Sequence, residues 1–166
     1  MIKPTNPFII SGYHSPEYFC DREEESRTIQ EALANGRNVM LISPRRMGKT
    51  GLIQNIFYRI NQECGSDTKT FYIDIFSTRN LGDFVRLLGN TVLGQLDSLP
   101  QKAMNRIGQF LKSCRPTLSF NELTGMPQVS LDIAPNREEA TLKEIFDYLG
   151  SSGRRCVLSI DEFQQI

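Results

Sequence analysis

An eight-residue segment of this chain has the residue types and spacing of a phosphate-binding loop. Residues Ser43–Thr50 match the pattern G-x-x-x-x-G-K-[ST] at every fixed position except the first, where Ser43 replaces glycine. Gly48 lets the backbone approach phosphates closely, Lys49 can reach the terminal phosphates, and the Thr50 hydroxyl can ligate Mg²⁺. ATP with magnesium is therefore the expected ligand. The predicted nucleotide-binding residues are Ser43, Pro44, Arg45, Arg46, Met47, Gly48, Lys49, Thr50 and Gly51.

The flanking segments have the patterns that such a loop requires. Residues 38–43 form a short, almost continuous apolar run, typical of a strand buried on both faces of a parallel sheet. Residues 51–60 carry apolar side chains at helical spacing. Backbone N–H groups at a helix start, together with the helix dipole, favour an anion. The alternative interpretation of the segment is a chance turn with a surface lysine. At its first position, Ser43 would be strained if the loop required a backbone φ that only glycine adopts easily.

A second set of candidate residues follows the apolar run 156–160. Asp161 and Glu162 are adjacent acids at the end of this predicted strand. A triphosphate with Mg²⁺ needs a carboxylate near the metal, which Asp161 can supply, directly or through water. Glu162 can orient and deprotonate the attacking water. Acidic residues at strand ends are also common without any function. The presence of the upstream phosphate loop favours the catalytic interpretation of these two acids.

Strands and helices alternate along the rest of the chain. A strand is predicted over 70–76 and a long amphipathic helix over 81–96, so the fold class is α/β with a mainly parallel sheet. Between Arg115 and Pro135 the apolar period changes to two, which predicts a β-hairpin. This hairpin is either a partner-binding insertion or a cover for the edge of the core.

Composition excludes several classes of protein. The chain has 166 residues, 39% of them hydrophobic, and 19 basic residues balance 19 acidic ones. Zero net charge argues against a dominant nucleic-acid surface, and no segment is long and apolar enough to span a membrane. The scattered cysteines predict neither a zinc site nor a disulfide framework, so a cytoplasmic location is expected. They are Cys20, Cys64, Cys114 and Cys156.

Three segments together resemble the AAA+-related P-loop ATPases of the archaeal-type ATPase family, near the STAND signal-transduction ATPases. Phe19–Glu25 resembles the F-x-G-R-E-x-E element of that family, with Asp21 where glycine is usual. Ser43–Thr50 resembles the family's G-P-R-R-x-G-K-T loop, and Cys156–Ile166 resembles its strand-D-E-F-Q segment. The three elements occur in the family's order.

The resemblance implies a Rossmann-like three-layer P-loop sandwich. It implies Asp161 near magnesium, Glu162 as hydrolytic base and Phe19–Glu23 beside the adenine. Residues 1–20 would form an N-terminal arm and residues 21–166 the first portion of the ATPase domain, ending after the Walker B strand. A later sheet strand and a C-terminal lid or winged-helix domain would belong to a longer protein, which could form homo-oligomers. The chain by itself is expected to be a weak or inactive ATPase.

Three functions remain open from the sequence. The first is Mg²⁺-dependent ATP hydrolysis in the complete protein, with Lys49 stabilising phosphate charge and Glu162 positioning water. The second is a nucleotide-dependent switch with slow hydrolysis, acting in signalling or in remodelling of DNA or protein complexes. A kinase is the third, although Glu162 beside Asp161 argues against it because a kinase must exclude water. Arg45 and Arg46 either add charge near the phosphates or point into solvent.

Overall fold

The computed structural model describes most of the chain, in two compact units that divide between Thr70 and Phe71. Its described residues are 12–13, 15–19, 21–65, 67–96, 107–120 and 127–165. Most of the predicted N-terminal arm, residues 1–20, therefore lies outside this description. No helix within these ranges combines the length and the apolar character needed to cross a membrane.

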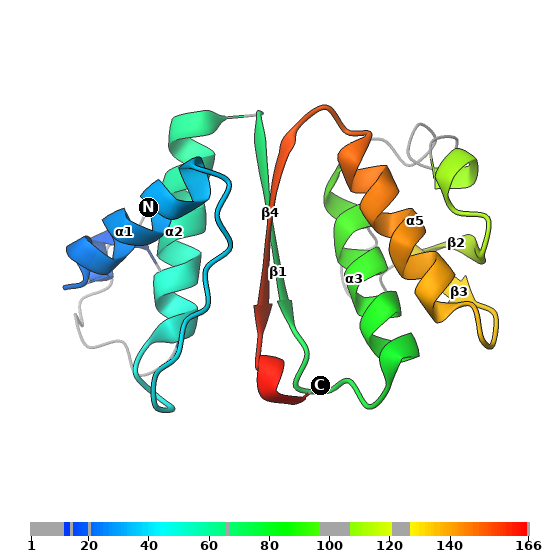
Figure 1. The fold of residues 1–166 in the computed structure, drawn as a ribbon, viewed down its shortest axis with the longest axis horizontal. Coiled ribbons are helices and arrows are strands. Elements are labelled where there is room, and N and C mark those ends of the chain that lie inside the picture. The colour runs from blue at the N-terminus through cyan, green and yellow to red at the C-terminus, as the bar shows by residue number, and fades with distance from the viewer. Residues whose placement is uncertain are drawn as a thin grey trace. The chain divides into compact units, whose positions relative to one another are not determined.

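The first unit is built on two helices (Figure 1). A 3-10 turn, η1 (Pro16–Tyr18), precedes helix α1 (Glu23–Ala34), and helix α2 (Lys49–Cys64) follows the loop segment. Apolar residues recur every third or fourth position along α2, so one face of the helix is buried. A small core forms from Leu52, Ile56 and Ile60, packed against Phe19, Ile29, Leu33 and Leu41.

The strand predicted over 38–43 is wrong for the described structure, which has no regular secondary structure over 37–44. Leu41 packs on the α1–α2 core, whereas Met40 and Ile42 on either side of it are 75% and 87% exposed. A strand is stabilised by hydrogen bonds to a neighbouring strand, and this segment has none in the described part of the chain. The apolar composition of residues 38–43 is compatible with burial on both faces of a sheet. Composition does not determine whether a neighbouring strand is there to pair with them.

The second unit contains the strands (Figure 1). Strand β1 spans Thr68–Asp74, three residues of it preceding the unit boundary, and helix α3 spans Leu81–Leu96. The chain continues through strands β2 (Cys114–Phe120) and β3 (Pro127–Ile133), helix α5 (Glu138–Gly150), strand β4 (Arg155–Asp161) and 3-10 turn η2 (Phe163–Gln165). The predicted strands over 70–76 and 156–162 and the predicted helix over 81–96 are thus confirmed.

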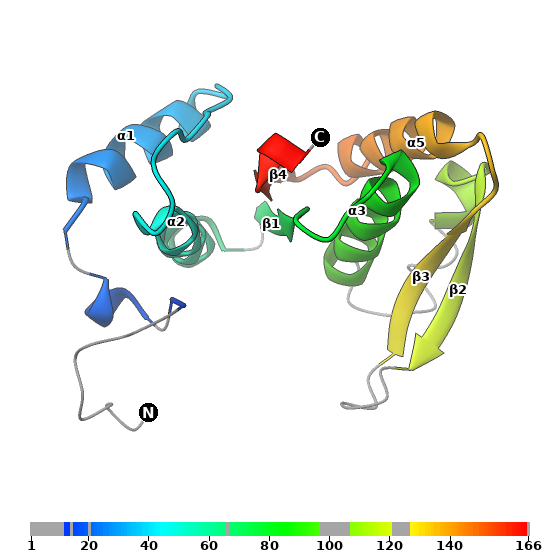
Figure 2. The same cartoon turned by 90° about the horizontal axis from the view of Figure 1, so that it is seen from below.

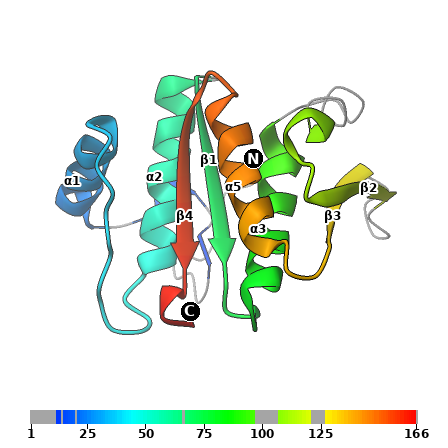
Figure 3. The same ribbon diagram turned by 45° about the vertical axis from the view of Figure 1, so that its right-hand side comes forward.

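Strands β1 and β4 pair side by side and run in the same direction, as Figure 3 shows. Helices α3 and α5 cover one face of this pair (Figure 2). Phe71, Ile73 and Ile75 point toward the helices and are at most 2% exposed. Alternation along a strand then places Tyr72 and Asp74 on the opposite face. On the helices, the buried core residues include Val85, Leu88, Val92, Ile145, Tyr148 and Leu149.

The predicted hairpin is confirmed as an antiparallel ladder in which Cys114 pairs with Ile133 and Phe120 with Pro127. Its inner strand, β3, packs against α3 at Gly89. A Cβ atom built at Gly89 would lie 2.2 Å from Leu131 Cδ1, so only glycine permits this close approach. The fold is mixed α/β with a small parallel sheet.

Candidate functional site

The predicted phosphate loop forms a tight turn that leads directly into helix α2. Gly48 is the capping residue, with φ 72° and ψ 23°, and Arg46 also takes a left-handed conformation at φ 62°. No side chain caps the helix start, and the first helical hydrogen bond runs from the Leu52 amide to the Gly48 carbonyl at 3.0 Å. The first turn of a helix directs its N–H groups outward, where an anion can accept them.

Ser43 is accommodated without backbone strain. Its φ is not in the left-handed region, in contrast to that of Arg46. The expected strain at the position of the missing first glycine is therefore not observed. The Ser43 carbonyl faces inward, where it accepts a hydrogen bond from Lys49. Serine at this position is compatible with the loop conformation.

The Lys49 ammonium turns back across the loop. It donates to the Ser43 carbonyl at 2.9 Å and to the Pro44 carbonyl at 3.2 Å, and both acceptors are uncharged. No carboxylate forms a salt bridge with it among the residues that the structure describes. Two neutral carbonyls orient the charge without neutralising it. The ammonium is thus positioned inside the loop and can still pair with an anion.

The segment before α1 is joined to the loop and to α2. The Arg22 guanidinium donates to the Met47 carbonyl inside the loop. Glu23 accepts two hydrogen bonds from Arg59 of α2, at 2.7 and 2.9 Å. The hydrogen bond from Arg59 is the largest of several effects that together lower the pKa of Glu23, although solvent exposure reduces the energetic value of the pair.

Asp21 has φ 63° and Arg22 has φ 80°, both left-handed. Glycine adopts this region most easily and aspartate tolerates it. Asp21 therefore holds a backbone conformation that glycine would adopt more easily. The Phe19 ring lies near Gly51, at 3.8 Å from a Cβ built there.

Both carboxylate oxygens of Asp161 are oriented by hydrogen bonds. The Tyr72 hydroxyl donates to Oδ2 at 2.7 Å, and the Glu162 amide donates to Oδ1 at 2.9 Å. The Ile75 amide donates to the Asp161 carbonyl at 3.3 Å, which aligns the ends of β1 and β4. These hydrogen bonds fix the orientation of the Asp161 carboxylate, and a carboxylate oxygen is the kind of ligand that Mg²⁺ prefers.

Glu162 follows in a left-handed turn with φ 59°. Its Oε2 accepts a hydrogen bond from the Gln164 amide group, and the residue is partly exposed. The hydrogen bond from Gln164 orients the Glu162 carboxylate. This geometry is suited to orienting a water molecule.

The structure brings together the residues within each half of the predicted site. Ser43–Thr50 and Gly51 lie in the first unit, and Asp161 with Glu162 lies in the second. The structure describes each unit separately, so the meeting of the two halves at one nucleotide remains a prediction. The described residues contain no group of three or more His, Cys, Asp or Glu side chains arranged to hold a metal. Mg²⁺ commonly takes only one or two carboxylates and completes its ligand sphere with phosphate and water oxygens, so a magnesium–nucleotide site does not require such a group.

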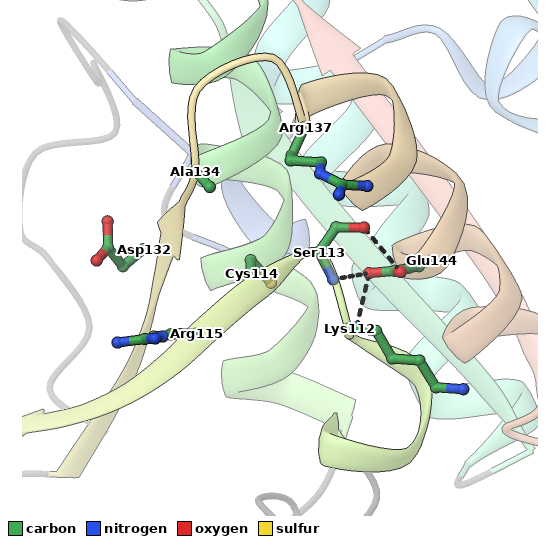
Figure 4. A pocket seen from close by; sticks show the side chains of 8 residues that line it. All are labelled: Lys112, Ser113, Cys114, Arg115, Asp132, Ala134, Arg137 and Glu144. Carbon is green, nitrogen blue, oxygen red and sulfur yellow. Dashed lines mark hydrogen bonds between the residues drawn. The ribbon is translucent and has the colours of Figure 1, made fainter.

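A pocket of about 650 Å³ lies elsewhere, between the β2–β3 hairpin and α5 (Figure 4). Its acid, Glu144, accepts hydrogen bonds from the Lys112 and Ser113 amides, both at 3.0 Å, and from the Ser113 hydroxyl at 2.9 Å. These bonds fasten the hairpin to α5, which makes Glu144 a structural carboxylate. Burial, with smaller effects of nearby acids, raises the pKa of the Cys114 thiol to about 11, so this cysteine is a poor nucleophile.

Tyr72 is the site residue that sequence reasoning missed. The available signal was strand parity: if Phe71 and Ile73 face the core, Tyr72 must face the opposite side of the sheet. Which hydroxyl reaches Asp161 depends on the pairing of β1 with β4, and a sequence does not state the order of its strands. Arg45 and Arg46 are both exposed at the surface of the loop.

Comparison of the chain with protein-family models, with curated proteins and with solved structures gives no match. The family resemblance therefore depends on the three sequence elements alone.

Proposed function

We propose that the chain binds ATP with Mg²⁺ through the loop Ser43–Thr50, and that Asp161 and Glu162 complete an ATP-hydrolysing site. The observation that carries this proposal is the position of Lys49. Its ammonium is held inside a turn that ends in a left-handed glycine and a helix start, against two neutral carbonyls. A polyphosphate would offer this charge much stronger acceptors.

In this proposal the loop binds the phosphates with its backbone. The N–H groups at the start of α2 and the helix dipole favour the negative charge. Gly48 leaves open space where a side chain would otherwise meet the phosphates. Lys49 stabilises the charge that develops on the transferred phosphoryl group. Arg22, through its bond to the Met47 carbonyl, helps to hold the loop in shape.

The acidic turn after β4 would supply the remaining groups. Thr50 and Asp161 would hold magnesium, which neutralises phosphate charge when it is bound. Glu162 would accept a proton from the attacking water, and Gln164 orients its carboxylate. We also propose that the chain is part of an AAA+-related P-loop ATPase with a three-layer sandwich fold. This proposal is supported by the three sequence elements that resemble that family.

Turnover by the Glu162→Gln variant tests the catalytic part of the proposal. ATP binding should survive this substitution, while any phosphate release by the protein should be lost because no base remains. Glu139→Gln, a matched change at an exposed position in the first turn of α5, should leave both unchanged. Measurable phosphate release that is equal in the parent and in Glu162→Gln would contradict the assignment. ATP that binds tightly to the parent without any turnover would favour the nucleotide-dependent switch.

A further inference from the structure

We propose that Tyr72 is a positioning residue for magnesium, acting through the Asp161 carboxylate. This inference rests on the proposed ATP-binding function and adds a residue that the phosphate-loop and acidic motifs do not contain. The Tyr72 hydroxyl donates to Asp161 Oδ2 at 2.7 Å, a short and well-formed bond between neighbouring strands.

The strand register explains why tyrosine reaches this acid. The Ile75 amide donates to the Asp161 carbonyl, which places Asp161 beside Asp74 in a parallel ladder. Tyr72 is two residues before Asp74 and therefore lies on the same face, which is the face opposite α3 and α5. A long side chain on that face can extend along the sheet to the carboxylate, whereas Phe71 and Ile73 point into the core.

The opposite oxygen of Asp161 is fixed independently. The Glu162 amide donates to Oδ1, made possible by the left-handed turn at Glu162. Hydrogen bonds to both oxygens set the plane of the carboxylate, so rotation about its side-chain bonds would break at least one of them. Groups that orient a metal ligand in this way commonly affect metal affinity about as much as a weak ligand does.

A purely structural role is the competing explanation, because the same bond also joins β1 to β4. The two roles predict different effects of magnesium on nucleotide affinity. A positioning residue changes the magnesium concentration needed for nucleotide binding, and it leaves magnesium-free binding unchanged. A residue that only joins strands changes folding stability, or changes nucleotide affinity equally with and without the metal.

The test is a titration of a fluorescent ATP analogue onto the full chain, at a series of magnesium concentrations and in EDTA. We expect Tyr72→Phe, which keeps the ring, to need about tenfold more magnesium for its half-maximal effect on nucleotide affinity. Asp161→Asn should raise this requirement at least as much. Tyr58→Phe is the matched control, because it removes the same hydroxyl group from a residue on α2 that is 44% exposed, and it should behave as the parent does. Affinity in EDTA should be the same in the parent, Tyr72→Phe and Tyr58→Phe, and Asp161→Asn, which removes a negative charge near the phosphates, should bind at least as tightly there.

Three results would overturn the inference. A normal magnesium requirement in Tyr72→Phe, with a raised one in Asp161→Asn, would show that Asp161 acts without Tyr72 and would leave the proposed function intact. An equal loss of affinity with magnesium and in EDTA would assign Tyr72 a structural role only. Absence of nucleotide binding by the parent chain would remove both this inference and the proposed function.

Discussion

Replacing Lys49 by alanine should weaken ATP binding by about ten- to thirtyfold. In the structure the ammonium bonds to two neutral carbonyls, those of Ser43 and Pro44. When ATP binds, it should exchange these acceptors for charged phosphate oxygens. The variant cannot make this exchange, and the amides at the start of α2 must bind the phosphates without it.

The expected magnitude follows from the two sets of bonds. A hydrogen bond to a charged group contributes about 1.5–3 kcal/mol net. Part of that gain is offset because the parent gives up its bonds to the carbonyls, so the lower range, about 1.5–2 kcal/mol, is expected. About 1.4 kcal/mol corresponds to a tenfold change in the dissociation constant, which gives the stated range.

Isothermal titration calorimetry with ATP and magnesium measures this change directly. Lys143→Ala, at an exposed position on α5, removes the same charge outside the loop and should bind as the parent does. Thermal unfolding without nucleotide should differ little between Lys49→Ala and the parent, which would exclude a folding defect. Equal ATP affinity for Lys49→Ala and the parent would refute the proposed role of the loop.

Other consequences of the structure can be measured without nucleotide. Gly89→Ala should lower the free energy of unfolding by about 1–3 kcal/mol in urea denaturation because the new methyl group meets Leu131, whereas Gly94→Ala, with open space, should raise it by up to about 1 kcal/mol; equal effects would contradict the packing. Cys114, with its pKa raised to about 11, should react with iodoacetamide at pH 8 about a hundredfold more slowly than free cysteine, by mass spectrometry, and rapid alkylation would show that it is not buried. The lowered pKa of Glu23 means that its bond to Arg59 stabilises the fold above the ordinary glutamate pKa and is lost as the pH falls through the lowered value. Glu23→Gln should therefore melt below the parent at pH 7 and together with it once the pH lies below the lowered value, and a difference that persists in acid would contradict the pair.

The local elements were largely predictable from the sequence. Helical spacing over residues 51–60 located α2, which the structure extends to Lys49–Cys64, because such spacing depends on neighbouring residues. The apolar run before Asp161 likewise located β4. Alternation located the β2–β3 hairpin for the same reason. Each of these elements is determined by residues that are close together in the sequence.

Features that depend on distant partners were not predictable. Residues 38–43 have the composition of a buried strand, but strand formation depends on a neighbour that the local pattern does not specify. The bond from Tyr72 to Asp161 joins residues 89 positions apart, and its existence depends on the pairing of β1 with β4. The bond from Arg22 to the Met47 carbonyl depends on the left-handed backbone at Arg22, for which arginine gives no signal.

A crystal structure with magnesium and a non-hydrolysable ATP analogue is the most direct test of the central claim. The measured quantity is the set of distances from the metal to its protein ligands. We predict the Thr50 hydroxyl at about 2.0–2.1 Å, and the Asp161 carboxylate either at that distance or one water away. Lys49 should contact the terminal phosphates. An analogue bound away from Ser43–Thr50, or an Asp161 carboxylate outside the metal's ligands and their waters, would contradict the proposed site.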